Sequence, residues 1–414
     1  MISASDRKTL RGLAERVREI AEHPSMPARR ARWHKLNALT PERPMVLCFP
    51  EGAWCELLPQ SVLQCSDEKL RHWEWSLRAK IYWWEHIRDD HTLEPYFDLN
   101  WRVSIGDYGV PVPFHQGANR GSYVWDPPLK NLDKDLSRLK PRSLSVDREA
   151  SARDMAQAAE IFGDLLPPRR RGGFWWTNGL TGDVIKLIGI ENLMLFPYDQ
   201  PEGLKRLMAF LRDEQMRLIT WAEREGLLTQ QNENDYTGSG GVAYTRELPQ
   251  KDYVPGSPVR LKDLWGFAES QETVGCSPAM FEEFVLPYQL PLLEKFGLNC
   301  YGCCEAVHTR IDLLLKYVPR LRRVSVAPWA DQAIMADKLA GRAVFSRKPN
   351  PALVSVSMDE DVVRKDLRET LRIAGKGALE MILKDTHTVE NQPKRITRWV
   401  KIAYEEVEEH CARG

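Results

Sequence analysis

The sequence predicts an α/β fold, and more specifically a TIM (β/α)8 barrel with an N-terminal helical extension. Short apolar runs alternate with amphipathic helical stretches from about residue 173 to the end, as in βα units of a parallel sheet. A further run at residues 45–49 brings the count of runs followed by helices to eight, the number that closes such a barrel. The 414 residues also exceed the ~250 that the barrel alone requires.

The eight predicted strands are short apolar runs, at residues 45–49, 173–177, 227–231, 264–269, 298–303, 323–327, 343–347 and 378–383. The helices predicted between and after them cover residues 148–166, 183–190, 201–225, 278–296, 306–317, 331–339, 359–374 and 394–410. An open, doubly wound sheet is the alternative topology. No Gly-x-Gly-x-x-Gly motif follows any of the runs, so the dinucleotide-binding form of that sheet has no support.

We expect residues 1–44 to form the helical extension and residues 45–414 to form one barrel domain. Residues 6–22 place their apolar side chains on one helical stripe, and helices are also expected at 28–39 and 66–88. A long insertion is expected around residues 90–150. It begins with a hairpin or edge strand at 101–112 and continues as a polar, proline-punctuated surface segment.

Composition narrows the class of protein. The 58 basic and 58 acidic residues cancel, so no overall field attracts nucleic acid or an anionic membrane. No apolar run approaches the roughly 20 residues that span a bilayer, and the N-terminal residues lack the apolar core of a signal peptide. We therefore expect a soluble, cytoplasmic protein, with a homodimer left open.

Polar side chains gather where the predicted strands end, which is where a parallel α/β barrel carries its chemistry. In chain order they are Glu51, Asn178, Gln231, Asn232, Asn234, Asp235, Tyr236, Glu269, Gln271, Cys303, Cys304, Glu305, Trp329, Asp331, Arg347, Lys348, Asn350, Asp385 and His387. The glycine-rich loop at 232–248 is predicted to be a mobile lid or a substrate-binding loop. Ten of the 14 tryptophans precede residue 177, and they indicate either core packing or an aromatic-lined pocket.

The only cluster among the eight cysteines is Cys300, Cys303 and Cys304. In a reducing cytosol such thiols are metal ligands or reactive groups more often than disulfides. Cys304 and His308 are four residues apart and share a helical face, and thiolate, imidazole and carboxylate groups are the ligands of zinc. The alternative is that the two adjacent cysteines fill a tight turn and that His308 caps a helix.

Several stretches resemble the uroporphyrinogen decarboxylase superfamily, which includes corrinoid-dependent methyltransferases. They are YDQPEGLKRLMAFLRDEQ (198–215), SPAMFEEFVLPYQLPLLEKFGL (277–298), YGCCE (301–305) and PNP (349–351). The resemblance covers residues 45–49 and then about residue 174 onward, and it implies a TIM barrel. The methyltransferase branch carries His-x-Cys-Gly at this strand end and a later cysteine, all on zinc. Here the strand end reads Cys-Tyr-Gly-Cys-Cys-Glu, and His387 stands nearest the late cysteine position.

The resemblance implies a methyltransferase that moves a methyl group from a small, methoxylated aromatic donor to a corrinoid on a transient partner protein, assisted by zinc. A cofactor-free decarboxylase and a non-catalytic corrinoid-binding subunit are the alternatives. The decarboxylase branch binds its substrate through N-terminal arginines and an aspartate, which residues 45–54 lack. The expected metal ligands are Cys303, Cys304, His308, His387 and Glu51. The expected catalytic residues are Glu269, Asp235 and Glu305. The expected substrate-binding residues are Asn234, Tyr236, Gln271, Trp54, Trp329, Arg347 and Asn350, with Trp83 and Trp84 adding to the apolar wall.

Overall fold

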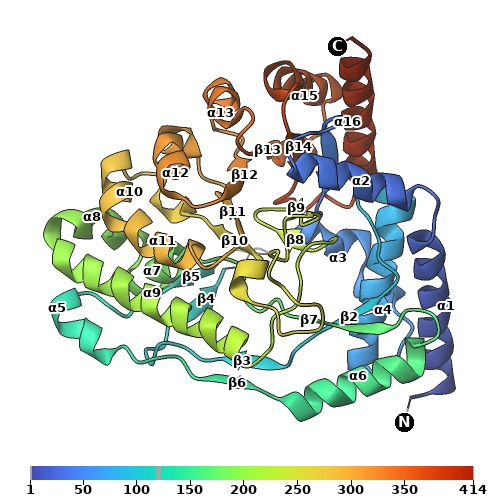
Figure 1. Cartoon of the computed structure of the whole chain (residues 1–414), viewed down its shortest axis with the longest axis horizontal. Coiled ribbons are helices and arrows are strands. Elements are labelled where there is room, and N and C mark those ends of the chain that lie inside the picture. The colour runs from blue at the N-terminus through green and yellow to red at the C-terminus, as the bar shows by residue number, and fades with distance from the viewer. Residues whose placement is uncertain (1, 118–122, 414) are drawn as a thin grey trace.

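A six-stranded, wholly parallel sheet lies at the centre of the computed structural model, which describes residues 2–117 and 123–413 (Figure 1). Its strands are hydrogen-bonded in the order β1-β14-β13-β12-β11-β10. They are β1 (Met45–Cys48), β10 (Trp265–Ala268), β11 (Leu298–Tyr301), β12 (Leu321–Val326), β13 (Val344–Arg347) and β14 (Leu379–Leu383). All but the start of β12 is buried, as expected of strands covered on both faces. Six of the eight predicted strands are thus confirmed, and the chain has a mixed α/β fold.

The predicted closure into an eight-stranded barrel is not met. Within the described residues the ladder ends at β10 and β1, and the expected strands at 173–177 and 227–231 join no sheet. The two segments still run side by side, because the Gly172 amide donates to Thr229 Oγ1 at 2.9 Å. The Asn178 amide donates to the Phe267 carbonyl of β10 at 2.8 Å. Side chains satisfy part of the backbone that a ladder would otherwise pair, so apolar runs at these places do not become strands.

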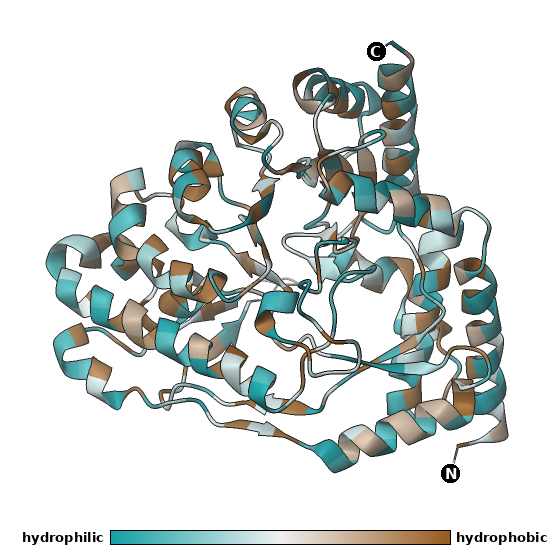
Figure 2. Ribbon diagram, viewed as in Figure 1, coloured by the Kyte–Doolittle hydropathy of each residue, from teal (hydrophilic) through white to brown (hydrophobic). Residues whose placement is uncertain are grey.

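Helices cover the outer face of the sheet, as the orange and red part of Figure 1 shows. They are α10 (Pro278–Phe284), α11 (Leu286–Leu293), α12 (Ile311–Tyr317), α13 (Gln332–Leu339), α14 (Ala352–Ser355), α15 (Glu360–Ala374) and α16 (Lys394–Arg413). The single helix expected at 278–296 is split at Val285, because Pro287 has no amide hydrogen to continue the helical ladder. Figure 2 shows that these helices carry apolar residues on one side and hydrophilic residues on the other, the pattern of a helix docked on a core.

Before β10 the chain is largely helical. The helices are α1 (Ala4–Ala21), α2 (Met26–Asn37), α3 (Trp54–Leu57), α4 (Glu68–Tyr82), α5 (Leu132–Asp135), α6 (Arg148–Phe162), α7 (Thr181–Ile188), α8 (Ile190–Asp199) and α9 (Pro201–Arg224). Leu10 and Val17 of α1 share a separate apolar cluster with Trp73 and Phe162. The N-terminal helices are thus present as expected, whereas the division into domains stays a prediction. No helix among the described residues is long and apolar enough to cross a bilayer.

Short two-stranded sheets account for the expected insertion. Strand β2 (Phe97–Asn100) pairs in parallel with β7 (Pro168–Arg171), and β3 (Val103–Ile105) pairs antiparallel with β6 (Leu144–Val146). Of the two alternatives at 101–112, the local hairpin is wrong and the edge strand is present as β3, whose partner β6 lies about 40 residues later. Strands β4 (Phe114–Gln116) and β5 (Tyr123–Trp125) pair on the surface. Residues 118–122 of the insertion lie outside the described residues.

The second half of the glycine-rich loop, residues 237–245, is buried. Its hairpin, β8 (Tyr236–Thr237) and β9 (Gly241–Val242), packs into the concave face of the sheet, where Val242 joins a core cluster with Met45 and Ile382 (Figure 1). Gly238 has φ +61°, and a Cβ there would lie 2.9 Å from the Cβ of Cys300. The glycines permit close approach to the strands, and Tyr236, Thr237 and Gly238 also line a cavity, so the role as a mobile lid or a substrate-binding loop stays a prediction.

Candidate functional site

Five polar residues converge at the carboxyl ends of β1, β11 and β14, and we call them the strand-end centre: Glu51, Cys303, Cys304, Lys384 and Asp385. The two thiols are 3.5 Å apart, and Cys304 Sγ lies 3.5 Å from Asp385 Oδ2. Lys384 Nζ lies 3.5 Å from Glu51 Oε1 and 3.6 Å from Asp385 Oδ1. The strands are parallel members of one sheet, so their carboxyl ends lie on one rim and bring together residues as far apart in sequence as Glu51 and Asp385, 334 positions.

Cys303 is the thiol of the pair that favours the thiolate. The hydrogen bond from the Cys304 thiol lowers the pKa of Cys303 most, and it outweighs the opposing effect of burial with help from Lys384 and Ser239. Ser239 Oγ donates to Cys303 Sγ at 3.3 Å. The same thiol–thiol hydrogen bond raises the pKa of Cys304. One proton is thus held on Cys304, and Cys303 carries nucleophilic character.

Lys384 is the cation of the strand-end centre. Burial lowers its pKa, but the anionic forms of Tyr236, Cys303, Asp385 and Glu51 together raise the pKa above the ordinary value of a lysine. The ammonium therefore stays charged. Burial raises the pKa of Tyr236 to about 12, and Lys384 partly opposes that shift. Tyr236, a predicted substrate-binding residue, thus lies next to the centre with its hydroxyl protonated.

Two buried carboxyl groups lie beside the thiols. Burial raises the pKa of Glu269 well above its usual range, and the charges of Glu272 and Glu305 raise it further. Glu269 is 1% exposed and accepts only the Gln271 amide, at 3.2 Å. Burial also raises the pKa of Glu305, which accepts the backbone amides of Ser270 and Cys303 at 2.9 and 2.8 Å. The surroundings of Glu269 therefore favour its protonated form, whereas Glu305 fixes the Cys303 turn.

An aromatic cavity of about 460 Å³ adjoins these groups. Its walls are predominantly aromatic, with glycine backbone between them: Gly172, Gly173, Phe174, Trp175, Trp176, Gln231, Tyr236, Thr237, Gly238, Trp265 and Phe267. None of these side chains carries a charge at neutral pH. Trp176 and Phe267 meet edge to face with centroids 5.3 Å apart. Trp265 and Phe267 share a face of β10 with Glu269, because side chains alternate along a strand.

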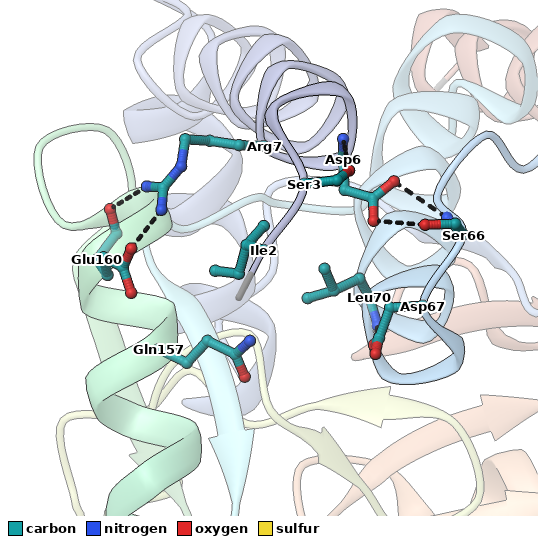
Figure 3. Close-up of a pocket in the computed structure, with 9 residues that line it drawn as sticks. All are labelled: Ile2, Ser3, Asp6, Arg7, Ser66, Asp67, Leu70, Gln157 and Glu160. Atoms are coloured by element: carbon teal, nitrogen blue, oxygen red, sulfur yellow. Dashed lines mark hydrogen bonds and ion pairs between the residues drawn. The ribbon is translucent and has the colours of Figure 1, made fainter.

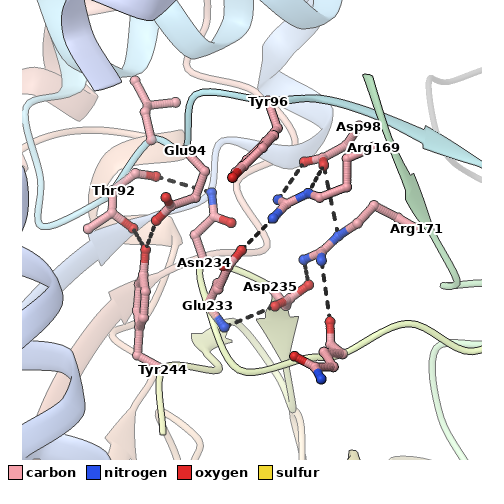
Figure 4. A network of polar contacts seen from close by, with 12 residues as sticks. Thr92, Glu94, Tyr96, Asp98, Arg169, Arg171, Glu233, Asn234, Asp235 and Tyr244 are labelled. Carbon is pink, nitrogen blue, oxygen red and sulfur yellow. Dashed lines mark hydrogen bonds and ion pairs between the residues drawn. The ribbon is translucent and has the colours of Figure 1, made fainter. Parts of the chain in front are cut away.

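Asp235 and Asn234 lie in a second cavity of about 280 Å³, which shares Tyr236 and Gln231 with the aromatic cavity. Asp235 belongs to the charged network, which we define as Asp98, Arg169, Arg171, Glu233 and Asp235 (Figure 4). Arg171 pairs with Asp235, and Arg169 pairs with both Asp98 and Glu233. A carboxylate held by an arginine is a poor proton donor, so the network does not favour the predicted acid role of Asp235.

A cavity of about 700 Å³ lies far from the strand ends, among α1, α4 and α6 (Figure 3). Its charged side chains already have partners. Asp6 accepts the amide and hydroxyl of Ser66 at 3.0 and 2.9 Å, and Arg7 pairs with Glu160. Pairing of this kind is typical of a helix interface, and we do not place chemistry there.

The two predicted histidine ligands lie apart from the thiols. His387 is exposed and lies against Gly52, and His308 sits in a short 3₁₀ turn with Nδ1 buried and unpaired. Across residues 2–117 and 123–413, no three histidine, cysteine or carboxylate side chains are arranged to hold a metal ion. The donor set therefore does not fit a preformed zinc site, and zinc stays a prediction of the resemblance.

The remaining predicted binding residues have structural partners. Arg347 points into the helix layer and pairs with Asp366 at 3.1 Å, and Asn350 caps α14. Trp54 packs edge to face with Trp83, at 5.3 Å between centroids, and Phe49 separates that pair from Tyr236. The other three residues contact different parts of the chain. Trp84 contacts His23 and Arg29. Trp329 is 60% exposed and donates to the Cys304 carbonyl, and the backbone amide of Gln271 donates to the Glu269 carboxyl group.

Sequence reasoning missed the residues that matter most electrostatically. Lys384 ends the last predicted strand one position before Asp385, and a lysine at the end of an otherwise apolar run was an available signal. Lys348 was noted only as part of a cationic group; burial lowers its pKa to about 7. The aromatic wall at 174–176 was assigned to a strand, and only its contact with Phe267 identifies it as cavity lining.

Comparison with known proteins identifies no family. No family model matches this sequence, and neither does any curated protein. Among solved structures, a methyltransferase from Methanosarcina mazei aligns with a TM-score of 0.49 over 91% of this chain and 98% of that chain, at 11% sequence identity. Similarity at that level carries no conclusion about activity here.

Proposed function

We propose that this protein is a methyltransferase that takes a methyl group from a small methoxylated aromatic donor and passes it to a corrinoid on a transient partner protein. The observation that carries the proposal is the uncharged aromatic cavity, whose wall residues Trp265 and Phe267 belong to the strand that ends just before Glu269, a buried carboxyl group whose pKa is raised well above its usual range. The sequence resemblance to corrinoid-dependent methyltransferases supplies the nature of the acceptor.

The aromatic cavity suits the donor. Its volume of about 460 Å³ falls within the ~300–1,000 Å³ of small-molecule sites. Phe267 and Trp176, set edge to face with an interplanar angle of 64°, offer two inclined walls for a flat ring. Tyr236 lines the same cavity and presents a protonated hydroxyl. An aryl ring would pack against these walls with its ether oxygen toward the carboxyl end of β10.

Glu269 supplies the chemistry that an aryl ether requires. When the oxygen–methyl bond breaks, the oxygen keeps the bonding electrons, and the methyl carbon forms its new bond to the acceptor. The departing phenolate is then neutralised by a proton from Glu269, whose protonated form burial favours. Positioned general acids of this kind contribute about 10²–10⁴-fold to a rate.

Tyr236 is a second donor toward the same oxygen. The Lys384 ammonium can only donate hydrogen bonds, so it leaves the tyrosine hydrogen free to point at a ligand. The Cys304 hydrogen bond and the Lys384 charge lower the pKa of Cys303, which favours the thiolate there over a proton-donating thiol. No step of the proposed reaction depends on a metal ion.

Incubation of the purified protein with reduced cobalamin and a panel of methoxylated aromatics tests the proposal. We expect the cobalt spectrum to change to that of methylcobalamin with at least one aryl methyl ether, and not with the demethylated phenol. Release of carbon dioxide from a polycarboxylate, with no methylation of cobalt by any donor, would replace the proposal with the decarboxylase alternative.

A further inference from the structure

Lys384 occupies the middle of the strand-end centre. Its side chain is only 5% exposed, although it follows directly on the last residue of β14. Nζ lies 3.5 Å from Glu51 Oε1, 3.6 Å from Asp385 Oδ1 and 3.3 Å from Ser239 Oγ. An aliphatic ammonium is therefore enclosed by two carboxylates and a hydroxyl, with the Cys303 thiol among the charges that act on it.

The carboxylates and thiol around Lys384 are of the kinds that bind metal ions. Their distances, however, are those of hydrogen bonds and ion pairs to an ammonium group. Zinc binds thiolate sulfur at ~2.3 Å and carboxylate oxygen at ~2.0–2.2 Å. Here the contacts to Nζ are all 3.3 Å or longer, and Asp385 contacts both Lys384 and Cys304 Sγ. A dication placed among these donors would meet the lysine charge at close range.

We infer that Lys384 is the resident cation of the strand-end centre, and that it takes the electrostatic place of a metal ion. It holds Glu51 and Asp385 together across the β1–β14 pair, and it acts on substrate through Tyr236, so it is a positioning residue. A corollary follows from the donor set. Removal of the lysine side chain leaves thiols and carboxylates facing a vacated position, which is a latent site for a soft divalent cation.

The inference concerns the centre itself and goes beyond the proposed methyl transfer. Its test uses metal binding alone, so it stands or falls whether or not any methyl ether is a substrate. The probe is Cd²⁺, because cadmium–thiolate bonds give an ultraviolet absorption band that reports sulfur ligation directly. Zn²⁺ in equilibrium dialysis serves as the second probe.

Four proteins are compared after treatment with chelator: the natural chain, Lys384→Ala, Lys384→Arg and Lys376→Ala. Lys376 is an exposed lysine on the loop before β14 and serves as the matched control. We expect Lys384→Ala to bind about one Cd²⁺ with the thiolate band, at least about ten-fold more tightly than the natural chain. Lys384→Arg and Lys376→Ala should bind no more tightly than the natural chain.

Two further experiments distinguish a site vacated by the lysine from a general loosening of the fold. The further change Cys303→Ser in Lys384→Ala should remove the thiolate band, and added ethylammonium should refill the vacated position and weaken Cd²⁺ binding. Circular dichroism checks folding, with Lys384→Met as the substitute if the alanine variant unfolds. Equal Cd²⁺ affinity in the natural chain and in the folded lysine variant would overturn the inference. Stoichiometric Zn²⁺ in the natural chain that Cys303→Ser abolishes would overturn it too.

Discussion

The charged network and the strand-end centre lie on either side of Tyr236, and they balance charge in opposite ways. In the charged network, two arginines meet three carboxylates through direct pairs. In the strand-end centre, Lys384 alone faces Glu51, Asp385 and the Cys303 thiol. Nearby Glu269 has no cationic partner among its described contacts.

This difference distinguishes residues that hold the structure together from residues that could take part in a reaction. Paired charges keep ordinary protonation states, which suits the joining of β7 to the 232–235 segment. Burial of a titratable group without an opposite charge shifts its pKa. Groups with shifted pKa values beside a cavity mark a functional site more often than paired charges do. The sequence predicts the same acid role for Asp235 and Glu269, whereas only Asp235 is paired with an arginine and only Glu269 has a pKa raised by burial.

The largest effect is expected from Glu269→Gln. The amide keeps the shape of the protonated acid but has no acidic proton, so we expect methyl transfer from an aryl ether to fall by about 10²–10⁴-fold. Asp235→Asn is the comparison variant and should lower the rate by less than about ten-fold. Equal losses in the two variants would contradict the division of roles between the two clusters. Initial rates of cobalamin methylation measure both.

The same variant has a signature in stability. The folded pKa of Glu269 is raised, so the folded state holds a proton that the unfolded state releases once the pH passes the ordinary glutamate value. This group therefore lowers the free energy of unfolding as pH rises from the unfolded pKa toward the folded one. Glu269→Gln should flatten that decline in urea denaturation between about pH 5 and 8. A natural chain and variant with parallel profiles would show that the carboxyl is already ionised.

Arg171→Ala tests the charged network and should act on stability. Arg171 and Asp235 are 16% and 10% exposed, and removal of one partner from such a pair leaves a nearly buried charge. We expect a loss of about 3 kcal/mol in the free energy of unfolding, measured by urea denaturation. Arg206→Ala breaks an exposed pair with Asp133 and should cost less than about 1 kcal/mol.

Gly238→Ala tests the hairpin of β8 and β9 that separates the two clusters. Gly226 provides a matched control, because its φ of +66° resembles the +61° of Gly238 while no atom lies within 4 Å of its added Cβ. Both alanine variants bear the strain of positive φ, about 1–2 kcal/mol. Gly238→Ala should lose at least about 1 kcal/mol more, since its Cβ meets Cys300. Equal losses of stability in the two variants, measured by thermal denaturation, would indicate that the hairpin shifts to accommodate the added Cβ.

The smallest effect is expected from Cys304→Ala. The Cys304 thiol donates to Cys303 and is the main cause of its lowered pKa, so its removal should shift the alkylation of Cys303 by iodoacetamide toward higher pH. Mass spectrometry of the peptide that contains Cys303 follows the reaction. Cys411→Ala, at an exposed site, should leave the profile unchanged. An unchanged profile in Cys304→Ala would assign the thiolate to Lys384 alone.

The sequence by itself determined the six strands of the sheet and most of the helices. The run at 45–49 is continuous and apolar, and the run at 378–383 is apolar except for Glu380, which is the pattern of a parallel sheet covered on both faces. It also determined that Glu51, Cys303 and Asp385 share one rim, because the carboxyl ends of parallel strands lie on one side.

Only the tertiary structure decided whether the sheet closes into a barrel, which segments pair as strands, and how neighbours shift the pKa values of buried groups. The segments at 173–177 and 227–231 look like strands locally, but side-chain partners and the 236–242 hairpin take the place of a ladder. In the sequence, the glycines of that hairpin indicate either a mobile loop or close packing. The contact that a Cβ at Gly238 would make with Cys300 shows that close packing there requires glycine. Likewise, the protonation of Glu269 and the position of Lys384 depend on burial and on neighbours far away in the chain, which no local pattern encodes.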